Sequence, residues 1–272
     1  MRVAVCQVQT GEDVSANLGV AERSLREAAA GGADLAALPE YFSYLGASRR
    51  RAELAEPVPG PTTDRVAALA RELGIWVLGG SVLERGDGGA IYDTSALFDR
   101  LGEVVARYRK IHLYDVDLPG QPPIRESATI APGEALVTHE TEFARVGLSI
   151  CYDVRFPELY RGLMAMGAEV LFVPSQFQHE TGKDHWHALL RARAIENQCF
   201  VVAPGQCGTF GDPAEGRRSY GHSLVVDPWG RILVEGTADD PGVWFADLDF
   251  LELRRIRQAL PALRHRRLGL TC

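Results

Sequence analysis

The stretch GLSICYDVRFPE, residues 147–158, places a cysteine between an apolar run and the start of a helix. The run 146–150 predicts a buried strand. The closing Pro-Glu pair predicts a first helical turn, because proline suits the first position and a carboxylate suits the positive helix end. A nucleophile at Cys151 would be exposed on a rigid backbone, with the Tyr152 amide facing a developing oxyanion. A small buried cysteine at a strand end is the alternative interpretation.

Outward from this stretch, strand-like and helix-like patterns alternate along the chain. Strands are predicted at 3–8, 35–38, 75–82, 170–173 and 199–203, and helices around 18–28, 66–73, 157–166 and 186–194. Asp-x-x-Gly turns at 99–102 and 227–230 predict one hairpin in each half. We therefore predict an α/β fold with helices outside and sheets inside. It forms a single domain over 1–272, with 259–272 as a C-terminal tail and mobile loops at 115–123 and 208–218.

Composition and charge exclude several classes of protein. The 272 residues carry a net charge of −7 with an estimated pI of 5.6, whereas nucleic-acid binders usually present a strongly basic face. The N-terminal residues 1–7 lack the pattern of a signal peptide, so we expect none, and no run approaches about 20 apolar residues, so no membrane partner is expected. The odd number of cysteines and their spacing suggest neither disulfides nor zinc, and we expect a cytoplasmic protein. They are Cys6, Cys151, Cys199, Cys207 and Cys272.

A thiol needs a base or a positive neighbour to become a good nucleophile. Glu40 follows a short apolar strand and a proline, so it is a candidate base, although an exposed carboxylate at a strand end fits equally. Lys110 ends a strand-like run in a chain with only two lysines. A chain rich in arginine keeps lysine where a compact point charge is needed. The second, Lys183, fits a helix start and limits this argument.

Competing motifs are weak. The chain lacks the glycine-rich phosphate and dinucleotide motifs and the H-E-x-x-H zinc motif. His179, His185 and His187 lie close together, but their spacing fits no known metal type, so we predict solvated or capping histidines and no metal.

Three motifs together resemble the nitrilase, or carbon-nitrogen hydrolase, superfamily over nearly the whole chain. They are LPEYF around Glu40, YRKIHL around Lys110 and ICYDVRFPE around Cys151. The resemblance also matches Glu126, in Arg-Glu-Ser, to a second active-site glutamate that positions the lysine and the nucleophile. It implies a four-layer α-β-β-α sandwich, paired into a homodimer or a higher homo-oligomer. The apolar C-terminal residues Trp244, Phe245, Phe250 and Leu251 suit either that interface or the core.

The resemblance implies an amidase that needs only an amide substrate and water, with no cofactor. Glu40 acts as general base, Cys151 forms a thioester, and Lys110 with the Tyr152 amide stabilises the oxyanion. Later motifs, such as TGKDHW at 181–186 and YGHS at 220–223, are most similar to deaminated glutathione amidases. The ω-amidases that act on 2-oxoglutaramate are rivals, and N-carbamoyl amino-acid hydrolases are more distant.

Two other classes of protein stay open at this point. A non-catalytic binding subunit of the same fold is disfavoured, because all four candidate catalytic residues are present. A redox sensor based on Cys151 would need Cys199 or Cys207 as a resolving partner.

Substrate contacts follow from charge. An anionic amide meets repulsion from a protein of net charge −7, so the site needs a local positive field. Arg155, four residues after Cys151, is a candidate for pairing with a substrate carboxylate, and a salt bridge to Glu158 is its alternative. Phe177 is predicted as an apolar wall or as core. Arg217 and Arg218 could meet a second carboxylate, or simply face solvent.

Overall fold

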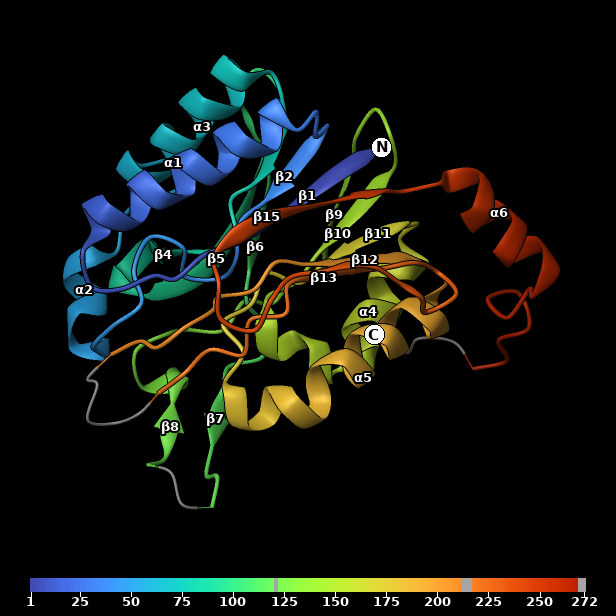
Figure 1. Cartoon of the computed structure of the whole chain (residues 1–272). Helices are drawn as coiled ribbons and strands as arrows, with labels where there is room; N and C mark the ends of the chain where they lie inside the picture. Colours follow the sequence, from blue (N-terminus) through green and yellow to red (C-terminus); the bar gives the residue numbers. More distant parts are fainter. Residues whose placement is uncertain (120–121, 212–216, 269–272) are drawn as a thin grey trace.

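The computed structural model describes residues 1–119, 122–211 and 217–268. Two large sheets lie between helices, so the predicted α-β-β-α sandwich is confirmed (Figure 1). The first sheet runs in the order β15 (Gly242–Asp247), β1 (Arg2–Gln7), β2 (Leu35–Ala37), β3 (Trp76–Leu78), β5 (Ile91–Phe98) and β4 (Val82–Arg85), and β6 (Val104–Arg109) also pairs with β5.

The second sheet runs in the order β14 (Ile232–Glu235), β13 (Leu224–Val226), β12 (Phe200–Ala203), β11 (Val170–Phe172), β10 (Arg145–Leu148) and β9 (Val137–Glu140). Strands β1, β2 and β3 are parallel, as are β10, β11 and β12. Each sheet therefore has a parallel centre whose carboxyl-end loops can carry chemistry.

Helices α1 (Val14–Ala30) and α3 (Pro61–Leu73) cover the first sheet, and α4 (Pro157–Ala165) and α5 (His179–Asn197) cover the second (Figure 1). Shorter elements are α2 (Arg51–Leu54), α6 (Phe250–Ala259) and the 3₁₀ turns η1 (Ser48–Arg50), η2 (Asp87–Gly89), η3 (Glu126–Ala128) and η4 (Cys151–Arg155). No helix in the described part of the chain is both long and apolar enough to cross a membrane.

Strand alternation explains the layers, because successive side chains of a strand point to opposite faces. Val3 of β1 packs in one cluster with Val146 of the other sheet. Its neighbour Ala4 packs instead with Leu25 of α1. Strand β1 and strand β10, which carries Val146, are each buried on two faces. This is why the sequence shows continuous apolar runs there rather than an alternation of apolar and polar residues.

The two predicted hairpins are confirmed as β5–β6 and β13–β14, one in each sheet. Their turns share one geometry. The side chains of Asp99 and Asp227 each accept two backbone N–H bonds within the turn. Gly102 and Gly230 close the turns at φ +77° and +88°, a conformation that favours glycine.

The predicted single strand 75–82 is wrong, because the structure has two strands, β3 and β4. Gly80 interrupts it at φ +43°, and a Cβ there would overlap the carbonyl oxygen of Pro39. This close approach brings Ser81 to the residue after Glu40, where its Oγ accepts the Tyr41 N–H at 3.0 Å. The break in the strand thus helps to hold the Glu40 loop.

The loop predicted at 115–123 begins as a strand, since β7 (Asp115–Val116) pairs with β8 (Ile124–Arg125). Parts of the two predicted loops lie outside the described residues, namely 120–121 and 212–216. The end of the predicted tail, 269–272 with Cys272, also lies outside them. The described part of that tail is attached to the body. Gln198 donates to the Leu260 carbonyl at 2.7 Å, and Leu263 packs against the main core.

Candidate active site

The residues predicted as catalytic meet at strand ends. Glu40 follows β2, Lys110 directly follows β6, and Cys151 follows β10. These three and Glu126 line one cavity of about 670 Å³. Strands that are distant in the sequence thus bring a thiol, an amine and two carboxylates to a single place.

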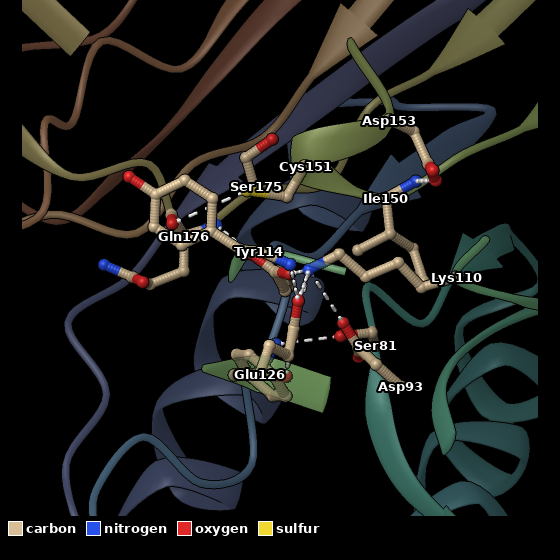
Figure 2. Close-up of polar contacts among 12 residues, drawn as sticks. Ser81, Asp93, Lys110, Tyr114, Glu126, Ile150, Cys151, Asp153, Ser175 and Gln176 are labelled. Atoms are coloured by element: carbon tan, nitrogen blue, oxygen red, sulfur yellow. Dashed lines mark hydrogen bonds and ion pairs between the residues drawn. The ribbon is translucent and has the colours of Figure 1, made fainter. Parts of the chain in front are cut away.

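Lys110 is held between two carboxylates (Figure 2). Its Nζ lies 2.7 Å from Glu40 Oε1 and 3.0 Å from Glu126 Oε1. All three side chains are buried. An ammonium group has three N–H donors, so two are used here and one remains for a substrate oxygen.

Neighbouring charges keep Lys110 and Glu126 ionised. Burial alone would lower the pKa of Lys110, but Glu126 and Glu40 outweigh it and raise that pKa well above its ordinary value. Burial alone would raise the pKa of Glu126, yet the Lys110 charge and the Tyr114 N–H hold it below its usual range. The amine is therefore a fixed positive charge at neutral pH.

Glu126 has supports that sequence reasoning missed. Tyr41 donates its hydroxyl to Glu126 Oε1 at 2.7 Å, and the backbone N–H of Tyr114 donates to Oε2 at 2.6 Å. With Lys110, these contacts fix both carboxylate oxygens. Tyr41 directly follows Glu40 and could have been suspected from that position, whereas Tyr114 carried no signal because it acts through its backbone.

Asp93 is a further carboxyl group that sequence reasoning missed. It is fully buried on β5, 3.6 Å from Lys110 Nζ, and neither of its carboxyl oxygens has a hydrogen-bond partner in the described chain. Burial raises the pKa of Asp93 well above its ordinary value, and Glu40 and Glu126 add to this against the opposing charge of Lys110. Burial therefore disfavours a negative charge on Asp93, and the nearby Lys110 ammonium favours it.

Cys151 starts the η4 turn with φ +45°, an uncommon conformation for a residue other than glycine. Its N–H donates to the Pro174 carbonyl at 3.0 Å, and its Sγ lies 3.6 Å from the Gln176 carbonyl oxygen. Burial raises the pKa of the Cys151 thiol well above its ordinary value, and the Glu40 charge raises it further. The resting group is a thiol, so nucleophilic attack requires a base.

Glu40 is the carboxylate whose charge acts most strongly on the Cys151 thiol. Its Oε1 accepts from Lys110, and its Oε2 accepts the Gln176 N–H at 2.5 Å. The same Gln176 supplies the carbonyl beside Cys151 Sγ, so one residue borders both groups. Tyr152 follows Cys151 in the first turn of η4, where helical N–H groups have no partner within the helix.

Asp153 joins the lysine and cysteine motifs, a role that sequence reasoning missed. It is fully buried and accepts the Tyr108 hydroxyl at 2.7 Å, the His112 N–H at 3.0 Å and the Ile150 N–H at 2.8 Å. Tyr108 and His112 flank Lys110 by two residues on each side. The carboxylate therefore ties the end of β6 to the cysteine turn.

Arg155 and Phe177 are not among the residues that line the cavity. The Arg155 guanidinium lies 5.2 Å from the Phe177 ring centroid and 3.2 Å from His185 Nδ1, and it makes no ion pair with Glu158 within the described chain. Phe177 packs against Trp186 in the core. Its neighbours Gln176 and Gln178 line the cavity instead, as expected where successive side chains alternate.

Two clusters have ligand atoms close enough for a metal ion. Glu40, Asp93 and Glu126 form one, but the Lys110 ammonium already lies among them. In the other, His187 and His222 hydrogen-bond one oxygen of Glu235, at 2.9 and 2.7 Å.

The three described cysteines outside the site, Cys6, Cys199 and Cys207, are weak nucleophiles. Cys6, Cys199 and Cys207 are free and buried, and burial raises the pKa of each thiol to about 12. A resolving partner for Cys151 would need a more acidic thiol, which disfavours the redox-sensor alternative.

The chain is similar to known proteins over nearly its whole length. A sequence model of the carbon-nitrogen hydrolase family matches residues 2–258. The deaminated glutathione amidase of Bos taurus is 45% identical over 271 residues, covering 97% of this chain and 81% of that protein. The omega-amidase NIT2 of Homo sapiens is 38% identical over 266 residues, covering 98% of this chain and 95% of that protein.

The similarity extends to a solved structure. The NitFhit protein of C. elegans has a TM-score of 0.90 at 36% identity, covering 98% of this chain. This chain spans 65% of that protein. Because the family model covers almost the whole sequence and the fold agrees, the chain belongs to the carbon-nitrogen hydrolase family and is a hydrolase of carbon–nitrogen bonds other than peptide bonds.

Proposed function

We propose that this hydrolase cleaves a small carboxylate-bearing amide through a thioester on Cys151, with deaminated glutathione as its first substrate. The observation that carries the proposal is the shared cavity, in which Cys151 lies with the Glu40–Lys110–Glu126 cluster. The choice of substrate is supported by the relatives named deaminated glutathione amidase at 41–46% identity.

In the acylation step, Glu40 takes the proton of the Cys151 thiol as sulfur attacks the amide carbonyl carbon. The carbonyl oxygen becomes an oxyanion. The remaining Lys110 N–H and the Tyr152 amide stabilise it, and one such donor is typically worth about 3–4 kcal/mol. Glu40 then returns the proton to the amine, the carbon–nitrogen bond breaks and a thioester remains.

Deacylation uses the same groups in reverse. Glu40 takes a proton from water, the water oxygen attacks the thioester carbonyl, and the proton passes to the departing Cys151 sulfur. The carboxylic acid leaves and the thiol is restored. Glu126 stays ionised throughout and positions Lys110, since its other oxygen is held by Tyr114. No step draws on a metal or an organic cofactor.

Other substrates and roles remain alternatives within this proposal. An ω-amidase acting on 2-oxoglutaramate is supported by the 38% identity to the omega-amidase NIT2. N-carbamoyl amino-acid hydrolysis is a more distant alternative. A non-catalytic subunit is disfavoured, because it would not need Cys151 and the buried Glu40–Lys110–Glu126 cluster in one cavity.

The test is turnover of purified protein against deaminated glutathione, 2-oxoglutaramate and an N-carbamoyl amino acid, with the Cys151→Ala variant as the matched blank. We expect the highest kcat/KM for deaminated glutathione and a loss of several orders of magnitude in the variant, whose fold should be unchanged. Cys207→Ala, a buried thiol outside the cavity, is the control and should retain activity. Turnover that survives Cys151→Ala would overturn the thioester mechanism.

We also propose a cytoplasmic homo-oligomer. Of the residues suggested for an interface, Trp244, Phe245 and Phe250 are half-buried against the core, whereas Leu251 is 59% exposed. Other exposed apolar side chains lie on the neighbouring elements α5 and the β13–β14 hairpin: Ile195, Trp229, Ile232 and Leu233. Free buried cysteines in the described chain suit a reducing compartment.

A further inference from the structure

The cavity needs a positive charge other than Lys110 if it takes an anion. Lys110 is already shared by Glu40 and Glu126, so this trio carries a net negative charge. An incoming carboxylate would be repelled by it. The other cations in the cavity wall are arginines, namely Arg49, Arg51, Arg125 and Arg217.

Arg51 differs from Arg49 and Arg125 in its burial and in its charged neighbours. Its guanidinium is half-buried, donates to Thr129 Oγ1 at 2.8 Å and lies 5.6 Å from the Tyr41 ring centroid. Within the described chain, no carboxylate lies within 4.0 Å of it. Arg125, by contrast, is neutralised by Asp117 at 2.6 Å, and Arg49 is solvent-exposed.

The charge on Arg51 is permanent. Burial opposes that charge, but Tyr41 and Glu126 outweigh it, so the pKa of the guanidinium lies above its ordinary value. A guanidinium has five N–H donors in a planar fork that matches a carboxylate. Only one of these donors has a hydrogen bond to another described residue, so the others can bind an oxygen of a ligand in the cavity.

We propose that Arg51 forms the subsite that binds a carboxylate of the amide substrate, and that it thereby sets the preference for anionic over neutral amides. Tyr41 connects the subsite to the chemistry. Its ring faces Arg51, and its hydroxyl holds Glu126, which holds Lys110. The carboxylate would therefore lie in the same cavity as the reacting carbonyl, on the side of Arg51. This inference rests on the proposed amidase function and names its substrate class.

The first test compares 2-oxoglutaramate with pentanamide, which has the same chain length and no carboxylate. We expect Arg51→Gln to lower kcat/KM for 2-oxoglutaramate roughly 100-fold, mainly through KM, and to change pentanamide turnover by less than about threefold. Arg51→Lys should recover part of the loss. Arg50→Gln is the matched control, because Arg50 is adjacent but pairs with Glu12 and Glu53 and lies outside the cavity. Equal losses on both substrates, or no loss, would overturn the proposal.

A second test does not depend on turnover. 2-Oxopentanoate keeps the α-keto carboxylate and lacks the amide, so its binding can be titrated calorimetrically. We expect binding to the wild type and to Arg50→Gln, and at least tenfold weaker binding to Arg51→Gln. Absent binding, or equal binding to all three proteins, would refute the subsite. If this binding pattern holds while no amide is cleaved, the amidase function fails and the subsite stands.

Discussion

Lys110 is placed so that its shape matters as much as its charge. Its Nζ is enclosed by Glu40 and Glu126 at 2.7 and 3.0 Å in a buried site. Arginine keeps the positive charge, but its planar fork is larger than an ammonium group and cannot occupy the same point. We expect Lys110→Arg to fold and to lose more than about 90% of kcat, which corresponds to at least ~1.4 kcal/mol in the barrier. Steady-state kinetics on the best amide substrate check this, and near-normal kcat would remove Lys110 as oxyanion donor.

The raised pKa of Asp93 predicts how the free energy of unfolding changes with pH. Its pKa is raised in the folded protein, so above the unfolded value of about 4 the unfolded chain loses a proton that the folded chain keeps. This group's contribution to stability therefore falls as pH rises from about 4 toward the folded pKa. Asp93→Asn removes the titration. We expect the stability of the variant relative to the wild type to improve steadily between pH 5 and pH 8.

Urea unfolding at several pH values measures that trend. Asp64→Asn, on the exposed side of α3, is the control and should show no such slope. A difference between Asp93→Asn and the wild type that stays constant with pH would mean that Asp93 is ionised in the folded protein, and would place a third negative charge beside Lys110.

The element that joins the catalytic motifs is the η4 turn, through Asp153. Three residues converge on this buried carboxylate, namely Tyr108, Ile150 and His112, the last through both its backbone N–H and its ring Nδ1. Removing the carboxylate leaves these donors unpaired, so we expect Asp153→Ala to cost about 3–5 kcal/mol in unfolding free energy and to lower kcat in the fraction that folds. Tyr108→Phe removes one hydroxyl and should cost about 1 kcal/mol. Equal, small losses in both variants would contradict this role for Asp153.

At the level of elements, most of the fold could be predicted because buried strands and amphipathic helices have periodic signatures. The runs at 146–150 and 199–203, and the two Asp-x-x-Gly turns, illustrate this. The break at Gly80 and the η4 turn were missed, because each depends on a tertiary contact. Gly80 approaches Pro39, and Asp153 of the η4 turn accepts the Tyr108 hydroxyl from β6.

The site divides in the same way. Glu40, Lys110 and Cys151 stand at strand ends within recognisable motifs, and Glu126 came from the family resemblance. Asp93 and Arg51 have no motif. Asp93 looks like one polar residue in a strand, and Arg51 like one arginine of three in a row. In the described fold, Asp93 stands out because its carboxyl oxygens lack hydrogen-bond partners. Arg51 stands out because it has a hydrogen bond to Thr129 but no carboxylate partner.

For the whole molecule, exposed apolar side chains mark the face on which we expect copies of the chain to meet. Arg231 lies 3.7 Å from Glu252, and Arg191 donates to the Gly230 carbonyl, so α5, the β13–β14 turn and α6 are neighbours. This face carries Ile195, Trp229 and Leu251, all largely exposed. Exposed apolar patches often mark interaction sites, so this face is our candidate for the proposed interface, where association must overcome a net charge of −7 on each copy.

We therefore expect a dimer or a multiple of it in solution, and we expect Leu251→Asp to weaken it. The substitution places a charge in the apolar face, where burial without a partner is costly. Leu101→Asp is the matched control. Leu101 is 68% exposed in the β5–β6 turn of the other sheet, and its change should leave the assembly intact. Light scattering at micromolar concentration measures the mass of each protein. A wild type that is only monomeric would refute the oligomer, and equal masses for all three proteins would place the interface elsewhere. Leu251 is not among the residues that line the cavity, so a Leu251→Asp monomer should keep measurable amidase activity, with its loss tracking any loss of thermal stability.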